Sequence, residues 1–291
     1  MNLLEEVCVP IVECIYNFEK YDENDNVIAE AIEWGKKLKI ISNDYETTDN
    51  CVYYAPNMPG SSFKERLLLS KSCLFAFAVD DLCDNLNGNE KFERIINIYE
   101  CSLFALREHE IHTSDNNRTD PFENAVIDIA TDFKPYLEND TALKMKVERE
   151  LTLYFEAMKM ERKASKKNMA LKLAEYEVYR HFTVGTNTVV GICNLLISHH
   201  VSNEMQCAQL YDLTFASFNK IVYVYNDLVS FEKDIKETST SNLIIVLKQE
   251  RKYDKWQDAI DEVVKMLKEE LKNFEMLAKL ISFDDGCALL V

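Results

Sequence analysis

The chain has 291 residues but only six Gly and five Pro, and this scarcity of turn residues is what constrains its fold most. An average protein carries roughly 7 % Gly and 5 % Pro. Every Pro lies at or before Pro135, and after that residue the only Gly are Gly185, Gly191 and Gly286. Because sandwiches, barrels and doubly wound sheets need many turns, the sequence predicts long helices joined by few connections.

No change in composition marks a linker, so we expect residues 1–291 to form one all-α domain. Two segments are expected to be connections: 42–62, which contains Pro56 and Pro59, and the polar stretch 112–121. The spacing of apolar residues predicts helices at about 27–41, 62–85, 90–109, 122–137, 141–164, 168–200, 204–237 and 252–281.

Charge and cysteine content exclude several classes of protein. The formal net charge of −17 argues against a nucleic-acid partner, because phosphate backbones are bound through clustered Lys and Arg. Nine Cys, an odd number without a CxxC pair, predict free thiols rather than a zinc site or a disulfide framework. The first residues carry Glu where a signal peptide would be basic, and no apolar run approaches a membrane span. We therefore expect a cytoplasmic protein without a transmembrane segment, either a monomer or a homodimer.

A first acidic cluster, Asp80, Asp81 and Asp84, follows an apolar stretch that ends in FAFAV. On a helix, Asp80 and Asp84 lie one turn apart on the same face. Carboxylates arranged in this way suit hard divalent cations such as magnesium, which prefers oxygen ligands. A solvated acidic helix end is the competing interpretation, and the apolar residues just before the cluster count against it.

A second cluster, Asn226, Ser230 and Asp234, has the spacing i, i+4, i+8, so that an amide, a hydroxyl and a carboxylate line one stripe of a helix. These three groups offer oxygen ligands to one further magnesium ion. Lys233 lies beside the stripe and could act as a point charge toward a phosphate. An ordinary polar helix face is the alternative, against which the preceding IVYVY stretch argues.

A third feature is Arg180, which lies in a long and mostly apolar predicted helix that also contains Gly185 and Gly191. An Arg grips phosphate oxygens with two parallel N–H groups and stays charged at any relevant pH. A surface or ion-paired Arg is the competing interpretation. The two Gly invite a local break in the helix, which would expose backbone carbonyls.

These three elements, in this order, resemble the metal and diphosphate sites of class I terpene synthases of the microbial type. The DDxxD motif of that family matches Asp80, Asp81 and Asp84, and its NDxxSxxxE motif matches Asn226, Asp227, Ser230 and, in place of Glu, Asp234. Arg180 stands at the position of the family's diphosphate sensor. The resemblance is specific over about residues 75–247, and the family's C-terminal Arg-Tyr pair would fall beyond Val291.

The resemblance implies a helical bundle with a central cavity and three Mg2+ ions, with Mn2+ as an alternative. Its substrate would be a linear prenyl diphosphate, with farnesyl diphosphate expected first, and the reaction would be ionisation followed by cyclisation or elimination. Arg180 and Lys233 would bind the diphosphate, and a helix break would lie at Thr183, Val184 and Gly185. The expected pocket wall comprises Cys73, Ala76, Phe77, Asn219, Val222 and Tyr223.

Two other interpretations remain. A prenyl diphosphate condensing enzyme would share the fold, but such enzymes carry two aspartate-rich motifs and this chain has one. A catalytically degenerate helical scaffold is the other, made plausible by Asp234 and by the missing Arg-Tyr pair. A scaffold, however, has no need to keep oxygen ligands and cations at motif spacing.

Overall fold

The computed structural model divides into two compact units, and most of the residues that it describes lie in helices. The residues it describes are 24–43, 58, 60–84, 89–107, 120–139, 141–166, 171–196, 209–236 and 241–285. Among them there is no strand, so the predicted all-α class is confirmed. No described helix combines the length and the apolar character that a membrane crossing requires.

One unit, residues 17–152 and 188–201, is built on the first helices of the chain. Helix α2 packs against α1, α3 and α4 through apolar faces that include Leu68, Leu74 and Val79. Trp34 Nε1, on α1, donates a hydrogen bond to Asp128 Oδ2, on α4 (2.6 Å). The helices are α1 (Asn24–Leu38), α2 (Phe63–Asp84), α3 (Asn89–Arg107), α4 (Pro121–Asn139), the first part of α5 (Thr141–Lys166) and nearly all of α7 (Thr186–Leu196).

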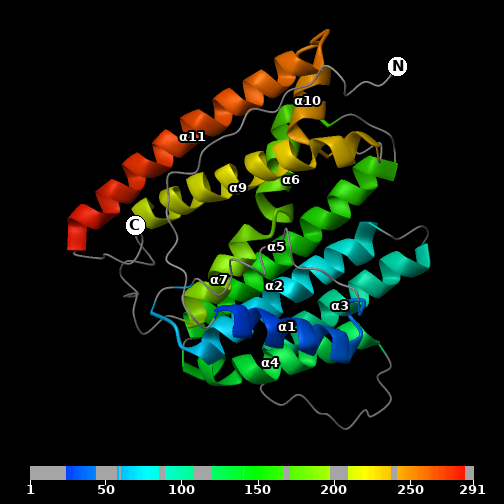
Figure 1. The fold of residues 1–291 in the computed structure, drawn as a ribbon, viewed down its shortest axis with the longest axis vertical. Helices are drawn as coiled ribbons and strands as arrows, with labels where there is room; N and C mark the ends of the chain where they lie inside the picture. Colours follow the sequence, from blue (N-terminus) through cyan, green and yellow to red (C-terminus); the bar gives the residue numbers. More distant parts are fainter. Residues whose placement is uncertain are drawn as a thin grey trace. The chain divides into compact units, whose positions relative to one another are not determined.

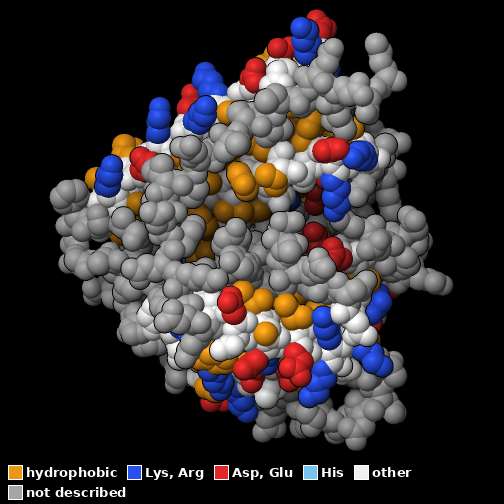
Figure 2. All heavy atoms as spheres, viewed as in Figure 1, with side chains coloured by type: hydrophobic (Ala, Val, Ile, Leu, Met, Phe, Trp, Pro, Cys, Tyr) orange, Lys and Arg blue, Asp and Glu red, His pale blue; other side chains and the backbone are white. Residues whose placement is uncertain are grey.

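In the other unit, α9 and α11 pack side by side in opposite directions (Figure 1). Phe218 meets Phe274 near one end, with ring centroids 6.0 Å apart, and Phe231 meets Trp256 near the other, at 5.4 Å. Figure 2 shows Lys and Arg side chains close to Asp and Glu side chains on the face that it draws. On α11, Lys265 Nζ lies 3.9 Å from Glu269 Oε1. The helices of this unit are the rest of α5, α6 (Leu173–Thr183), α9 (Gln209–Lys236), α10 (Leu243–Glu250) and α11 (Trp256–Asp285).

Helix α10 was not predicted. It begins with five apolar residues in succession, 243–247, which show no alternation between an apolar and a polar face. All five are buried in a core formed with residues of α9 and α11. A helix that is apolar all round is a buried helix, and a short apolar run cannot be identified as a helix by its period.

The predicted helix at 168–200 is divided in the structure, and the break falls at Gly185. Helix α6 ends at Thr183, Val184 serves as its C-cap, and α7 begins at Thr186. Gly185 has φ +76°, a conformation that residues with a Cβ rarely adopt. Gly191, in contrast, lies inside α7 and does not interrupt it. The other predicted helices match described helices to within a few residues at their described ends.

The two Gly should respond to alanine in opposite directions. We expect Gly185→Ala to lower the free energy of unfolding by about 1–2 kcal/mol, because the left-handed conformation is strained for alanine. Gly191→Ala should leave stability unchanged or raise it by up to about 1 kcal/mol, since a helical Ala replaces a helical Gly. Urea denaturation of both variants measures this. A stable Gly185→Ala protein would contradict the assigned break.

Candidate functional site

The first acidic cluster lies at the C-terminal end of α2. Asp80 and Asp81 are exposed there, directly after the buried Ala78 and Val79. Asp84 is the last residue of α2, and its side chain lies outside the described residues. The sequence pattern of an apolar helix that ends in exposed carboxylates is therefore present in the structure.

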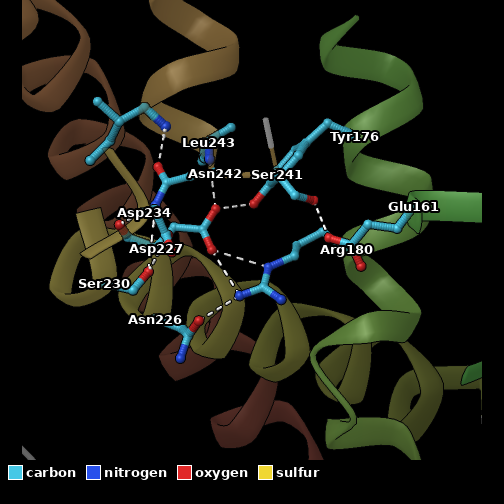
Figure 3. A network of polar contacts seen from close by, with 11 residues as sticks. Glu161, Tyr176, Arg180, Asn226, Asp227, Ser230, Asp234, Ser241, Asn242 and Leu243 are labelled. Carbon is cyan, nitrogen blue, oxygen red and sulfur yellow. Dashed lines mark hydrogen bonds and ion pairs between the residues drawn. The ribbon is translucent and has the colours of Figure 1, made fainter. Parts of the chain in front are cut away.

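The second cluster lies on α9, in the other unit. Asn226 is exposed, and Ser230 and Asp234 are half-buried on the same stripe. The Ser230 hydroxyl donates a hydrogen bond to Asp234 Oδ2 (2.7 Å), as Figure 3 shows. Lys233, the predicted diphosphate ligand, is exposed on the neighbouring face of the helix.

Arg180, on α6, reaches the second cluster. Its Nη2 donates to Asn226 Oδ1 (2.5 Å), and its Nε and Nη2 both donate to Asp227 Oδ1, at 3.1 and 2.8 Å. Arg180 and Asn226 therefore lie side by side, as the motif spacing predicts. The competing interpretation also holds in part, because the guanidinium is ion-paired with Asp227.

Asp227 matches the second motif, but the sequence alone assigned it no role. It is fully buried on α9, and its Oδ2 accepts hydrogen bonds from the Tyr176 hydroxyl and from the backbone N–H of Leu243 (2.6 Å) (Figure 3). Two signals of a structural role were available: Asp227 follows Asn226 in the motif but lies on the apolar side of α9, and Tyr176 lies one turn before Arg180.

Burial and charge shift the pKa values of Asp227 and Arg180 in opposite directions. Burial raises the pKa of Asp227, while the Arg180 charge and the hydrogen bonds from Tyr176 and Leu243 oppose that shift. Burial alone would lower the pKa of Arg180, but the Asp227 carboxylate, together with further acidic neighbours such as Glu161, outweighs burial and raises that pKa. Burial also raises the pKa of Tyr176, so its hydroxyl keeps the proton that it donates.

The helix break at Thr183, Val184 and Gly185 is held by Asn219 of α9. Where α6 ends, the His181 carbonyl lacks a described helical N–H partner, and Asn219 Nδ2 donates to it (2.7 Å). The same nitrogen lies 3.2 Å from Asn187 Oδ1, at the start of α7. Asn219, predicted as a pocket residue, is completely buried and connects both sides of the break.

The other predicted pocket residues differ in exposure. Cys73 is buried in the core of one unit, Ala76 is exposed and Phe77 is half-buried against that core. In the other unit Val222 is half-buried, and Tyr223 packs edge-on against Tyr176, with centroids 6.3 Å apart. Their assignment to a pocket wall stays a prediction.

The donor atoms on α9 fit a hard divalent cation. They are an amide oxygen, a hydroxyl and a carboxylate, all oxygen, of which magnesium uses several together with water and phosphate. Asp234 Oδ1 makes no hydrogen bond to a described residue. Ser230 donates its proton to Asp234 Oδ2, so the lone pairs of the Ser230 hydroxyl can face a cation. Among the described residues, no three His, Cys, Asp or Glu side chains lie close enough together to hold a metal ion.

Removal of the Asp227 charge should be costly. We expect Asp227→Asn to lower the free energy of unfolding by about 3 kcal/mol or more, because Arg180 would keep a largely buried charge without its partner. Asp212→Asn, on the exposed first turn of the same helix, is the matched control and should stay within about 0.5 kcal/mol of wild type. Urea denaturation of the two variants measures this difference in the free energy of unfolding.

His181 should make stability depend on pH. Burial lowers its pKa from 6.5, so below pH 6.5 the unfolded chain takes up a proton that the folded chain resists. Stability contributed by neutral His181 is then lost as the pH falls through 6.5 toward the folded pKa. Unfolding curves at a series of pH values should show a shallower acid decline for His181→Gln. Identical slopes would contradict the buried neutral imidazole.

Comparisons with known proteins place this geometry in a family. The chain is similar to the crystal structure of an a-eudesmol synthase (TM-score 0.76, 18% identity, 96% of this chain and 88% of that one). It is also similar to a hedycaryol synthase in complex with nerolidol (TM-score 0.73, 12% identity, 94% and 88%). A search of curated protein sequences found no match.

The family model for terpene synthase family 2, C-terminal metal binding, matches residues 71–273. That range includes both oxygen-ligand clusters, Arg180 and the break at Gly185. Because the model covers more than half of the chain, the protein belongs to terpene synthase family 2 and carries its metal-binding domain.

Proposed function

We propose that this terpene synthase uses magnesium to ionise a linear prenyl diphosphate and guides the carbocation to a terpene hydrocarbon or alcohol. The observation that supports this best is the placement of the Arg180 guanidinium beside Asn226, at one end of the oxygen stripe that continues through Ser230. Cationic and oxygen-ligand groups thus adjoin on two helices of one unit, as a metal-bridged diphosphate would require.

Two sets of residues would hold the ions, of which we propose three, with Mn2+ as an alternative. Asn226, Ser230 and Asp234 would hold one. The cluster of α2 would hold the others through Asp80, supported by Asp81 and Asp84. When bound, such ions neutralise the negative charge that develops on the departing diphosphate.

The chain's own cations are arranged for an anion. Nε and Nη2 of Arg180 are used by Asp227 and Asn226, while Nη1 makes no hydrogen bond to a described residue. The buried carboxylate thereby fixes the plane of the guanidinium, and we propose that Nη1 donates to diphosphate oxygens. Lys233 is exposed beside the stripe and would add a flexible point charge.

The substrate is proposed by resemblance to the family. We propose farnesyl diphosphate, one domain over residues 1–291, and a pocket wall that includes Phe77 and Val222. The backbone at Thr183 to Gly185 would direct a carbonyl toward the developing cation, because α6 ends there and Gly185 turns the chain away from the helix.

The test is product formation. Purified protein is incubated with geranyl, farnesyl and geranylgeranyl diphosphate, with Mg2+ or with chelator, and volatiles are analysed by gas chromatography and mass spectrometry. We expect Mg2+-dependent products from farnesyl diphosphate. No product from any of the three would favour the degenerate scaffold. A parallel incubation with added isopentenyl diphosphate, treated with phosphatase before analysis, tests the condensing enzyme, which would give a longer prenyl alcohol.

Variants test the assigned ligands. Asn226→Ala and Asp80→Ala should each reduce turnover by more than about 100-fold, since even the partners behind metal ligands typically matter 10–100-fold. Arg180→Lys should also impair turnover, because a single ammonium group replaces a planar guanidinium that can donate two parallel hydrogen bonds. Asn273→Ala, on the exposed face of α11, is the control and should turn over normally. Normal product yield from Asn226→Ala would refute the metal assignment.

A further inference from the structure

Asn242 is a fully buried polar residue outside the metal motifs. It precedes α10 with extended backbone (φ −136°, ψ 135°), and its Oδ1 accepts a hydrogen bond from the Ile244 N–H (2.9 Å). This contact makes Asn242 the N-cap of α10, which satisfies one of the N–H groups that a helix start leaves without a partner. Capping uses only the oxygen of the amide.

The amide nitrogen of Asn242 has a separate use. It donates to Asp234 Oδ2 (2.8 Å) and to the backbone carbonyl of Asp227 (2.8 Å), and it lies 3.5 Å from Ser230 Oγ (Figure 3). Both of its N–H groups are therefore directed at α9, one of them at a proposed metal ligand. Capping a helix requires neither bond.

These bonds orient the ligands. Asp234 Oδ2 accepts from both Ser230 Oγ and Asn242 Nδ2, so the carboxylate is held through one oxygen while Oδ1 has no hydrogen bond among the described residues. Because the proton of Ser230 is used by Oδ2, the hydroxyl can present lone pairs to a cation. Ligand oxygens held by such outer partners bind metals more tightly than ligands left mobile.

We propose that Asn242 is a positioning residue for the metal site on α9, which sets the carboxylate of Asp234 and, through it, the hydroxyl of Ser230. The proposal rests on the proposed function, because it needs a cation at this stripe. A purely structural role would confine Asn242 to the start of α10.

Two substitutions separate the roles. Asn242→Ser and Asn242→Asp both place good N-cap acceptors at the start of α10, but neither has an amide N–H to give to Asp234. Two variants are used so that a folding defect in one leaves the other to be measured. Asn273→Ser, on the exposed face of α11, is the matched control.

The first readout is binding. Thermal unfolding of the intact protein is followed against Mg2+ concentration in the presence of inorganic pyrophosphate, and the Mg2+ dependence of turnover is measured beside it. We expect the Mg2+ concentration for half of the stabilisation, and for half of the maximal rate, to rise about tenfold or more in both Asn242 variants. The melting temperature without Mg2+ should change little in Asn242→Ser, since the cap is kept and no charge is added. Asn242→Asp keeps the cap but places a second buried carboxylate beside Asp234, so it should melt somewhat lower.

The outcomes are distinct. Wild-type Mg2+ dependence in a folded Asn242→Ser or Asn242→Asp protein would overturn the positioning role. If both variants melt far below wild type without Mg2+, Asn242 is structural, which also overturns it. A wild-type protein that Mg2+ and pyrophosphate do not stabilise would instead refute the proposed function. Asn226→Ala, which removes a proposed ligand, gives the Mg2+ dependence of a site without one of its ligands in the same assay.

Discussion

The arrangement of α6, α9 and α10 depends on the buried carboxylate of Asp227. Removal of such a group from water costs several kcal/mol unless its charge and oxygens are satisfied. Here Arg180 and Tyr176 come from α6, and the Leu243 N–H comes from the start of α10. Since these donors belong to two neighbouring helices, the Asp227 carboxylate can be buried only when α6 and α10 are both correctly placed. Its burial therefore constrains the packing of these helices, and the carboxylate also holds the Arg180 guanidinium in position.

Polar groups of α9 also complete the ends of its neighbours. The start of α10 finds an acceptor in Asp227, and the end of α6 finds a donor in Asn219. Helix ends leave backbone groups without partners, and such groups are costly when buried. Because α9 supplies these partners, the apolar first part of α10, residues 243–247, can lie inside the core, and α6 can stop before Gly185 without leaving its end unpaired.

Much of this follows from the sequence. Scarce Gly and Pro predict the all-α class, and the i, i+4, i+8 spacing places Asn226 and Ser230 on one stripe of a helix, where the structure has them. The roles of Asp227 and Asn242 do not follow, because their partners come from other helices and no periodicity encodes such contacts. Helix α10 was not predicted for a related reason. Its residues 243–247 are all apolar, so no alternation of apolar and polar residues indicates a helical period.

The shorter acid at position 234 has a structural counterpart. A Glu, which the family usually has there, would carry its carboxylate one methylene farther from α9. The carboxylate of Asp234 instead lies within 2.7 Å of Ser230 Oγ and 2.8 Å of Asn242 Nδ2, both of which hold the same oxygen. These two hydrogen bonds fix the orientation of the shorter side chain, so at the metal site that we propose less conformational entropy would be lost when a cation binds. A water between Asp234 and the cation, or a small shift of α9, would then supply the missing reach.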